Sequence, residues 1–466
     1  MSHDFVPQFP ARTPLAMAVG ALFFCAAPTA WATQTVTNCL DDGSTGSLRK
    51  AIQNAAPFEL VDASGLSCST ITLRTGALFI TQSDLQIQGP GTSKLTITGK
   101  YNGTTEPYRL ITHYGGGELT ISNLSMSKGY MKAPSYAAAR GGCILSLGSL
   151  YLENVSLGFC TAKSVTATHG AKGGALYVEK TLTINNSSIG LGEAYGYTTS
   201  AAGGAIYVRG ELTVKNSTIS GNSALGKTGT NIGFGGAIYS RGSSVYLSNT
   251  TVSGNYAGLS YGAISSHNLS GSLEINQSTI SGNKANAGKI GGVYASNERV
   301  YLYNTTIAFN TAASTIPGGA GVGIAVYGGG STPKALFSST LISNNTYGAS
   351  ATSKDFTSSG VTVTGTNNLI RVPDGPVPGG TITGKCPFLG PLKNNGGMPQ
   401  THALLGGSPA LDAGANVLNF NFDQRGSPYV RMSSPPGAAT QKPDIGAFEV
   451  NRLDKIFDAT FDSGCT

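Results

Sequence analysis

The sequence predicts an all-β chain wound as a parallel β-helix. We expect a single-stranded β-solenoid with about three short strands per coil, an N-terminal helical cap and a loop-rich C-terminal cap. Composition is the first of three observations behind this prediction. Of 466 residues, 65 are Gly and 21 are Pro, while charged residues make up 11%. These proportions disfavour a helical enzyme, a charge-driven disordered chain and a transmembrane protein.

The second observation is a repeat. An element resembling Gly-Gly-Ala-Ile-Tyr returns at steps of 32, 30, 32, 26 and 30 residues. A second element, for example Leu212–Asn216, follows each copy. Two elements that keep one period indicate an architecture in which a single core extends from unit to unit. The copies of the first element begin at Gly141, Gly173, Gly203, Gly235, Tyr261 and Gly291.

The third observation is the pattern inside each repeat. Apolar and polar residues alternate in the second element, as they do in half-buried strands. Gly and Asn stand where the chain must turn through positive φ. About three strands and their turns in roughly 30 residues describe one coil of a parallel β-helix, and such coils stack about 4.8 Å apart. We therefore expect Ile206, Ile238 and Ile264 to lie in one buried column.

Asn residues recur at the corners of the repeat, as in the two Ser-Thr-Ile-Ser-Gly-Asn units that end at Asn222 and Asn283. Stacked amides can hydrogen-bond from coil to coil and satisfy backbone groups at a turn. Asn-x-Ser/Thr triplets at the same period also match acceptors for N-glycosylation. Because the triplets follow the repeat period, an internal Asn ladder is the favoured interpretation.

Further strand-like pieces extend the solenoid at both ends, at residues 85–88, 95–98, 119–122 and 336–342. Residues 46–55 combine an N-cap candidate with the apolar spacing of a short amphipathic helix. Such a helix would cover the exposed end of the solenoid. We divide the chain into a signal peptide (1–32), an N-terminal cap (33–65), β-helix repeats (66–347), a C-terminal cap (348–450) and a tail (451–466).

The first segment is typical of an export signal. Arg12 precedes the apolar stretch Leu15–Ala27, and Ala30-Trp31-Ala32 has the small-x-small pattern of a cleavage site. A membrane anchor is the alternative, but the apolar stretch is short for a span and Pro28 follows it. We expect cleavage after Ala32, no transmembrane segment in the mature chain, and a location in the periplasm, on the cell surface or outside a bacterium.

Cleavage would remove Cys25 and leave six cysteines. An even number in an exported chain predicts disulfides. Six cysteines allow fifteen pairings, and the sequence leaves them open. Pairing between neighbours is preferred because each pair then falls within one region: Cys39 with Cys68, Cys143 with Cys160, and Cys386 with Cys465.

The repeat region resembles a known fold group. Residues 66–345 are similar to secreted bacterial right-handed parallel β-helix proteins of the pectate-lyase-like group. The Gly-Gly-Ala-Ile-Tyr and Ser-Thr-Ile-Ser-Gly-Asn units resemble the repeats of polymorphic outer-membrane proteins. Asn38–Ile52 resembles the CSLREA segment of such proteins, with Lys50 in place of its acidic residue. These resemblances imply a right-handed coil and an exported protein.

Four ordered pieces near the C-terminus resemble the choice-of-anchor Q domain of bacterial surface proteins. They are Ser408–Gly414, Asp423–Gly426, Arg431 and Pro443–Glu449. This resemblance implies a surface or secreted protein and assigns no chemistry to it.

Candidate catalytic residues are few. Enzymes of the fold group place carboxylates on one outer sheet to bind calcium or act as acid and nucleophile. Here no Asp lies between Asp84 and Asp355, and the eight Glu of that region are spread over several coils. A β-eliminating lyase can use another base. Solvated turn positions are the favoured interpretation of the four candidates, Arg209, Arg241, His169 and His267, of which Arg209 and Arg241 follow equivalent strands and could stack as a basic pair.

The C-terminal cap holds the candidate metal ligands. Carboxylates there could gather calcium or pair with Arg425 in structural bridges. Bridging is favoured because a loop-rich cap needs it, so we expect no cofactor, with calcium as the alternative. The carboxylates are Asp412, Asp423, Asp444 and Glu449.

Charge supplies the functional hint. Residues 85–354 carry 18 Lys and Arg against eight Glu, a balance of +10. A long basic surface with many Tyr can bind acidic polysaccharide, lipopolysaccharide or, without specificity, nucleic acid, although a merely solvated surface is the alternative. No motif supports a specific nucleic-acid partner.

The sequence therefore favours an exported, monomeric, noncatalytic β-helix protein that presents an extended interaction face, adhesin-like or glycan-binding. The alternative is a polysaccharide lyase or glycoside hydrolase that acts on acidic glycans in the β-helix groove.

Overall fold

The computed structural model describes residues 32–99, 108–134, 137–165, 168–197, 199–226, 232–268, 270–297, 299–313, 323–328, 334–348, 353–432 and 442–450. The expected signal peptide, apart from Ala32, and the expected tail at 451–466 lie outside these residues. No helix in the described part of the chain has the length and apolar character needed to cross a bilayer.

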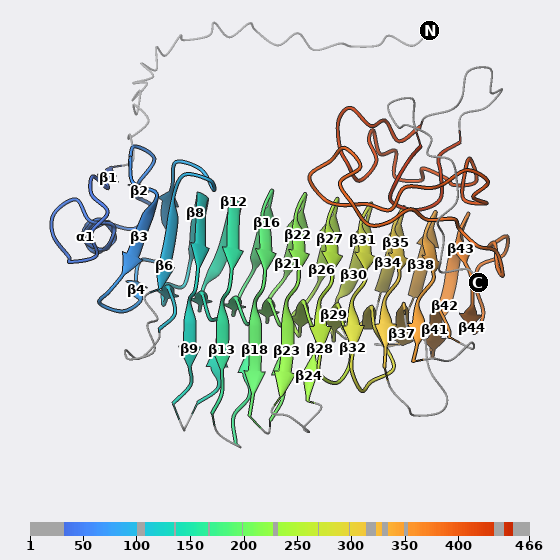
Figure 1. Cartoon of the computed structure of the whole chain (residues 1–466), viewed down its shortest axis with the longest axis horizontal. Coiled ribbons are helices and arrows are strands. Elements are labelled where there is room, and N and C mark those ends of the chain that lie inside the picture. Colours follow the sequence, from blue (N-terminus) through green and yellow to red (C-terminus); the bar gives the residue numbers. More distant parts are fainter. Residues whose placement is uncertain are drawn as a thin grey trace, which may run out of the picture.

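The chain forms a parallel β-solenoid, which confirms the predicted fold class (Figure 1). Its largest sheet, sheet A, has 21 strands, which form two columns on either side of a corner. Sheet A contains β1 (Thr33–Thr35), β2 (Leu60–Asp62), β3 (Thr70–Leu73), β5 (Leu85–Gln88), β6 (Thr96–Gly99), β8 (Glu118–Ser127), β12 (Ser149–Gly158), β16 (Leu182–Asn185), β17 (Ser188–Gly190), β21 (Leu212–Lys215), β22 (Thr218–Ser220), β26 (Val245–Ser248), β27 (Thr251–Ser253), β30 (Ser272–Asn276), β31 (Thr279–Ser281), β34 (Arg299–Tyr303), β35 (Thr306–Ala308), β38 (Lys334–Ser338), β39 (Leu341–Ser343), β42 (Thr362–Thr366) and β43 (Leu369–Ile370).

Three smaller sheets complete the coils. Sheet B contains β4 (Leu78–Ile80), β7 (Ile111–His113), β11 (Ile144–Ser146), β15 (Leu176–Val178), β20 (Ile206–Val208), β25 (Ile238–Ser240), β29 (Ile264–Ser266), β33 (Val293–Asn297), β37 (Ile324–Gly328), β41 (Phe356–Ser359) and β44 (Pro373–Asp374). Sheet C contains β9 (Tyr130–Lys132), β13 (Thr161–Lys163), β18 (Glu193–Gly196), β23 (Ser223–Gly226), β28 (Tyr256–Ala257), β32 (Lys284–Ala285), β36 (Thr311–Ala312) and β40 (Thr346–Tyr347). Sheet D contains β10 (Ala139–Arg140), β14 (Ala171–Lys172), β19 (Ala201–Ala202) and β24 (Gly233–Phe234).

Equivalent residues of successive coils form columns. Ile206 pairs in register with Ile238, which pairs with Ile264, and all three side chains are fully buried. The predicted isoleucine column is thus confirmed. The main cluster of buried apolar residues extends from Val36 to Ile370, and parallel pairing continues to β44, past residue 347.

The two glycines of the repeat are required for different structural reasons. The first has positive φ, 66° at Gly173 and 69° at Gly203, as expected for a sharp turn. The second packs against the next coil, since a Cβ at Gly204 would lie 2.0 Å from the carbonyl oxygen of Gly236. Tyr261 takes the first-glycine position with φ of 66°, a conformation that costs a non-glycine residue roughly 1–2 kcal/mol.

An Asn ladder is present, although not where the Asn-x-Ser/Thr triplets lie. In a buried corner after sheet A, each amide Nδ2 donates to the Oδ1 of the next coil at 2.8–2.9 Å. Each backbone N–H of the ladder donates to the same oxygen. None of these Asn is the first residue of an Asn-x-Ser/Thr triplet, so the ladder does not explain why the triplets recur at the repeat period. Its members are Asn222, Asn255, Asn283, Asn310 and Asn345, and Asp355 ends it.

The triplet Asn occupy the corner inside sheet A instead. Asn186, Asn216 and Asn249 each have φ of 48°, so these corners turn through positive φ as predicted. Amide contacts in this column are partial: Asn154 Nδ2 donates to Asn123 Oδ1 at 2.8 Å, while other members bond elsewhere.

The predicted N-terminal helix is confirmed as α1 (Leu48–Asn54), at one end of the solenoid (Figure 1). Ser47 caps it by accepting a hydrogen bond from the backbone N–H of Lys50 at 3.3 Å. Its Leu48 and Ile52 side chains are buried in the core. Arg49 forms an ion pair with buried Asp41 at 2.7 Å inside the cap, and its hydrogen bonds to the carbonyl oxygens of Gly76 and Ala77 hold the cap to the first coils.

Two of the preferred disulfides are present, Cys39–Cys68 and Cys143–Cys160. Cys386 is also disulfide-bonded, and its expected partner Cys465 lies outside the described residues.

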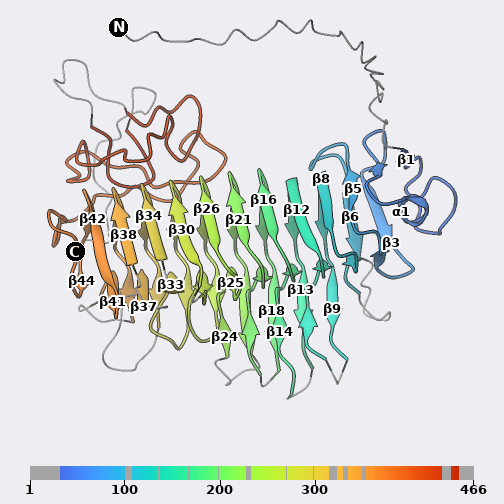
Figure 2. The ribbon, with the colours of Figure 1, turned by 180° about the vertical axis from the view of Figure 1, so that it is seen from behind.

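The C-terminal cap follows β44 and is built of loops with isolated bridges, for example between Leu389 and Leu404. It lies over the later coils of sheet A, as both views of the ribbon show (Figures 1 and 2). Hydrogen bonds between Thr251 and Gln400 and between Asn304 and Ala415 join the two parts. The solenoid leaves the earlier coils of sheet A uncovered on this side.

Asn283→Ala is expected to destabilise the fold by at least about 3 kcal/mol, because each buried polar group left unpaired costs about 1–3 kcal/mol. The substitution removes the acceptor for two N–H groups of Asn255 and the donors to Val252 and Asn310. Thermal and denaturant unfolding would measure the loss. Asn286→Ala, at an exposed position of the same coil just after β32, is the matched control. Equal stability of the two variants would contradict the ladder.

Candidate functional site

The outer face of sheet B carries a stack of tyrosines. Because side chains alternate along a strand, the burial of Ile206 and Val208 turns Tyr207 outward. Tyr177, Tyr207 and Tyr239 pair in register in successive coils. Their ring centroids lie 5.3 and 5.4 Å apart, with the rings nearly parallel. The coil spacing thus places one ring directly above the next.

The stack continues past a coil that lacks a tyrosine. Ser265 occupies the ladder position there, and the ring of His267, two residues later, fills the space. That ring lies 5.3 Å from Tyr239 and 4.8 Å from Tyr294, and its Nε2 is 2.8 Å from Ser265 Oγ. We call the set the aromatic stack: Tyr177, Tyr207, Tyr239, His267, Tyr294 and Tyr327.

The end of the stack repeats this substitution. Ala325 pairs with Tyr294 in register but carries no ring. Tyr327, again two residues later, lies 5.4 Å from Tyr294. In both coils a small residue in the ladder is compensated by an aromatic residue two positions later, just after β29 in one coil and within β37 in the other.

Basic side chains flank the stack. On one side, Arg140 and Lys172 are register partners in sheet D. The guanidinium carbon of Arg140 lies 5.0 Å from the Tyr177 centroid, and Lys172 Nζ lies 5.2 Å from the Tyr207 centroid. These distances are within the range of cation–π attraction.

On the other side, three charged residues occupy equivalent positions of successive coils. Glu179, Arg209 and Arg241 each follow a strand of sheet B, and each backbone N–H donates to a carbonyl one coil back. Arg209 forms an ion pair with Glu179, which also accepts a hydrogen bond from the Tyr177 hydroxyl at 2.8 Å. The aromatic stack together with Arg140, Lys172, Glu179, Arg209 and Arg241 is called the basic–aromatic strip below.

Burial and mutual repulsion dominate the electrostatics of the strip. Burial lowers the pKa of Lys172, and the positive charges of Arg140, Arg209 and Arg241 lower it further, whereas Glu179 opposes them. Burial and the hydrogen bond to Glu179 raise the pKa of Tyr177 to about 12, so its hydroxyl stays protonated at neutral pH. An anion bound along the strip would relieve the repulsion among these cations.

Three of the four sequence-predicted candidates meet on this strip: Arg209, Arg241 and His267. Arg209 and Arg241 do occupy equivalent positions of successive coils, while the stacking of their side chains as a basic pair stays a prediction. His169 lies apart, on the turn before β14, with its Nδ1 2.8 Å from Thr168 Oγ1. Sequence analysis missed the tyrosines, Arg140 and Lys172. The final Tyr of Gly-Gly-Ala-Ile-Tyr was the available signal, because outward residues in register must stack.

The strip is better suited to binding than to proton transfer. Arginine does not lose its proton in proteins, and burial raises the pKa of Tyr207, which disfavours a tyrosinate base. Glu179 is held by Arg209 and Tyr177. Burial, aided by the charge of Arg241, lowers the pKa of His267, and this ring is packed between two tyrosines.

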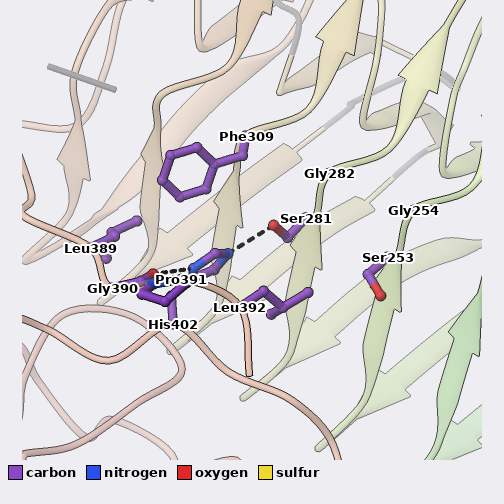
Figure 3. Close-up of a pocket in the computed structure, with 10 residues that line it drawn as sticks. All are labelled: Ser253, Gly254, Ser281, Gly282, Phe309, Leu389, Gly390, Pro391, Leu392 and His402. Atoms are coloured by element: carbon purple, nitrogen blue, oxygen red, sulfur yellow. Dashed lines mark hydrogen bonds between the residues drawn. The ribbon is translucent and has the colours of Figure 1, made fainter. Parts of the chain in front are cut away.

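A second site is the cavity of about 640 Å³ between sheet A and the C-terminal cap (Figure 3). His402 is 4% exposed and points toward β31: its Nε2 lies 2.8 Å from Ser281 Oγ, and its Nδ1 lies 2.7 Å from the Gly390 carbonyl oxygen. Phe309 and Leu389 line the cavity with apolar surface. Ser281 belongs to a register column that also includes Ser220 and Ser253. No carboxylate is among the residues that line the cavity. The contacts of His402 therefore serve to fasten the cap to the solenoid.

The cap carboxylates form buried bridges. Asp423 accepts two hydrogen bonds from the Arg425 guanidinium at 2.7 and 2.9 Å, which confirms the expected Asp–Arg bridge. That guanidinium lies between the rings of Tyr429 and Phe448, 3.8 and 3.9 Å from their centroids. Burial raises the pKa of Asp423, while Arg425 opposes the shift.

The other cap carboxylates also bond to protein groups. The oxygens of Asp444 accept backbone N–H groups of Asp412 and Val450, and Glu449 accepts the N–H of Asp444. Burial raises the pKa of Asp444 to about 6. Among the described residues, no group of three or more His, Cys, Asp or Glu is placed to hold a metal ion. The expected lack of a cofactor stays a prediction.

Comparisons with known proteins add little to this geometry. No family model matches the chain, and no curated protein matches it. One matching solved structure is described as the crystal structure of pectate lyase Pel9A; it is 12% identical, and the match covers 91% of this chain and 98% of that chain with a TM-score of 0.43. A likeness at this level carries no argument about binding or catalysis. The resemblances to polymorphic outer-membrane repeats, the CSLREA segment and the choice-of-anchor Q domain stay predictions.

Asp423→Ala is expected to destabilise the protein by about 3–5 kcal/mol, because it leaves the buried Arg425 charge without its partner. Asp374→Ala, at an exposed carboxylate, is the control, and denaturant unfolding gives the comparison.

EDTA should leave the melting temperature of the wild-type protein unchanged, since backbone N–H groups already bond to the carboxylate oxygens of the cap. A melting temperature that falls with EDTA and recovers with calcium would contradict the bridging account.

The stability of the stack should depend on pH through His267. Its pKa is lower in the folded protein than in the unfolded chain, so folding disfavours the proton and stability is lost as pH falls through about 6.5. His267→Tyr removes this penalty. The melting temperature of the variant minus that of the wild type should therefore increase from pH 7.5 to pH 5.5. A constant difference would show that the His267 ring is not buried in the stack.

Proposed function

We propose that the protein is an exported, noncatalytic β-helix protein whose basic–aromatic strip binds an anionic polysaccharide. The observation that carries the proposal is the pairing of cations on both sides of the aromatic stack. Arg140 and Lys172 stand one coil apart on one side, and Arg209 and Arg241 stand one coil apart on the other. A polymer with a charge on each unit fits a surface whose charges repeat about every 4.8 Å.

The tyrosines support the same partner. Tyr177 and Tyr207 are only 1% and 3% exposed, so a ligand would meet mainly the partly exposed Tyr239, Tyr294 and Tyr327. Hydroxyls that keep their protons can donate hydrogen bonds to sugar oxygens or carboxylates. A regular row of donors beside a row of cations suits an extended acidic glycan better than a compact ligand.

The export part of the proposal rests on the N-terminal segment and the disulfides. Cys39–Cys68 and Cys143–Cys160 are typical of an oxidising compartment. The signal-like segment at 1–32 and the choice-of-anchor Q-like cap suggest a bacterial surface or secreted protein, acting as a monomer in an adhesin-like role. The basic strip would then face glycans outside the cytoplasm.

A polysaccharide lyase is the second candidate, and one observation favours it. Titratable groups do converge on the strip: the charges of Arg241 and Arg209 act against the burial that raises the pKa of Tyr207. The raised pKa of Tyr207 opposes its use as a base, which is why binding is preferred.

Removing two cations of the strip, as in Lys172→Gln/Arg241→Gln, should weaken binding of polygalacturonate at least about tenfold at low salt, because charge-assisted contacts are lost. Titration calorimetry or surface plasmon resonance would measure it. Lys215→Gln/Lys284→Gln, which removes two exposed cations of sheets A and C, is the matched control. Fully methyl-esterified polygalacturonate, which lacks the charges, should bind weakly to every form.

The same incubation separates the two candidates. Binding without products at 235 nm and without new reducing ends supports the binding protein, whereas unsaturated products made by the wild type and lost in the strip variant would establish the lyase. Equal affinity of the strip variant and the control would refute both uses of the strip.

A further inference from the structure

A polar groove of about 630 Å³ on the outer face of sheet A leads up to the C-terminal cap. Two columns of side chains line it. Ser156, Ser188 and Thr218 come from the second half of each coil, and Asn154, Asn186 and Asn216 come from the corner before it. None of its lining residues carries a charge. Gln400 and the 81% exposed Met398, both of the cap, complete the groove at its far end.

The hydroxyl column of the groove continues beneath the cap. Thr218 pairs in register with Thr251, which pairs with Thr279 and then Thr306. Under the cap each of these hydroxyls has a partner. Thr251 donates to the Gln400 carbonyl oxygen at 2.6 Å, Thr279 donates to the Gln424 side chain at 2.5 Å, and Thr306 accepts the Ala447 N–H at 3.0 Å.

The corner Asn column behaves in the same way. Beneath the cap, Asn249 donates to the carbonyl oxygens of Asp423 and Gln424, both at 3.2 Å. Farther along, Asn304 donates to Ala415 at 3.3 Å and Asn367 donates to Ala413 at 2.9 Å. The chain near Ala413 and Ala415 therefore runs along the solenoid and offers its carbonyls to successive coils.

In the open groove the corresponding donors point back into the solenoid. Asn154 donates to Asn123, and Asn186 donates to Glu153 at 2.7 Å. Asn216 makes a longer bond of 3.3 Å to Asn185. Ser188 bonds only its column neighbour Ser156, at 3.1 Å, among the contacts of the described residues. In the uncovered coils these donors thus bond to neighbouring coils of the solenoid, whereas in the covered coils Thr251 and the corner Asn donate to carbonyl oxygens of the cap.

We propose that this groove binds an extended, uncharged polypeptide segment of a partner protein. The segment would lie beside Met398 and continue the path of the cap, with its carbonyls accepting from the corner Asn and the Ser/Thr column. A polypeptide is preferred over a neutral glycan because the occupant of the same two columns in the later coils is a polypeptide backbone. The absence of charge among the lining residues predicts a peptide without acidic or basic clusters.

The test fills the groove. Ser188→Tyr/Thr218→Tyr places two rings on outward positions, where the fold should tolerate them. Thr183→Tyr/Thr213→Tyr is the matched control, because these outward positions of sheet A lie in a column that already contains Tyr151 and Tyr246. A phage library of random linear dodecapeptides is selected on the immobilised full chain. The enriched peptides are then synthesised and their dissociation constants measured by fluorescence polarisation.

Enriched uncharged peptides should bind the wild type and the control equally, and should bind the filled variant at least about tenfold more weakly. Lys172→Gln/Arg241→Gln should bind them normally, which separates this groove from the basic–aromatic strip. Failure of any peptide to enrich over the filled variant, or equal binding to it, would overturn the proposal. Binding of uncharged oligosaccharides on a glycan array that is lost in the filled variant would replace the polypeptide with a sugar. Unchanged melting temperatures confirm that each variant is folded.

Discussion

Parallel backbone pairing between successive coils is the constraint on which the rest of the structure depends. Once Ile206, Ile238 and Ile264 are register partners, every other position of those coils is aligned as well. A residue is then judged by its column, since its neighbours above and below are the equivalent residues of the adjacent coils. Hydrophobic columns make the core, the Asn222–Asn345 column satisfies a buried turn, and outward columns make continuous surfaces.

The same constraint explains why the two candidate binding surfaces are long and regular. On sheet B, tyrosines at equivalent positions of successive coils form a stack, and basic residues at equivalent positions form a row beside it. On sheet A, hydroxyl residues and corner Asn at equivalent positions of successive coils form two polar columns. The cap covers these columns in the later coils and leaves them open in the earlier coils. The same polar surface is therefore occupied by polypeptide at one end of the molecule and unoccupied at the other.

Sequence analysis predicted features that depend on spacing along the chain. The coil, the isoleucine column and the equivalence of Arg209 and Arg241 follow from the repeat period. The capping helix follows from an N-cap and apolar spacing at 46–55, and the two disulfides were preferred as pairs of neighbouring cysteines. It placed Asn at the corners, Asn222 and Asn283 among them, but wrongly linked the ladder to the Asn-x-Ser/Thr triplets, because burial of Asn222 rather than Asn216 depends on how the corner turns. His267 and Tyr327 fill the spaces that Ser265 and Ala325 leave in the aromatic stack. This is a packing effect that the local sequence pattern does not predict. The seating of the cap on sheet A joins residues more than a hundred positions apart, such as Asn249 and Asp423, and is likewise invisible in the repeat.

The most direct test of coil stacking is a distance between two spin labels measured by double electron–electron resonance. Thr183 and Leu336 lie on the outer face of sheet A in one register column, joined through Thr213, Tyr246, Glu274 and Tyr301. Five steps of about 4.8 Å place their backbones about 24 Å apart. A cysteine and a nitroxide at each of the two positions should give a narrow distribution near that distance. A broad distribution, or one centred far from about 24 Å, would show that the coils are not stacked in this register.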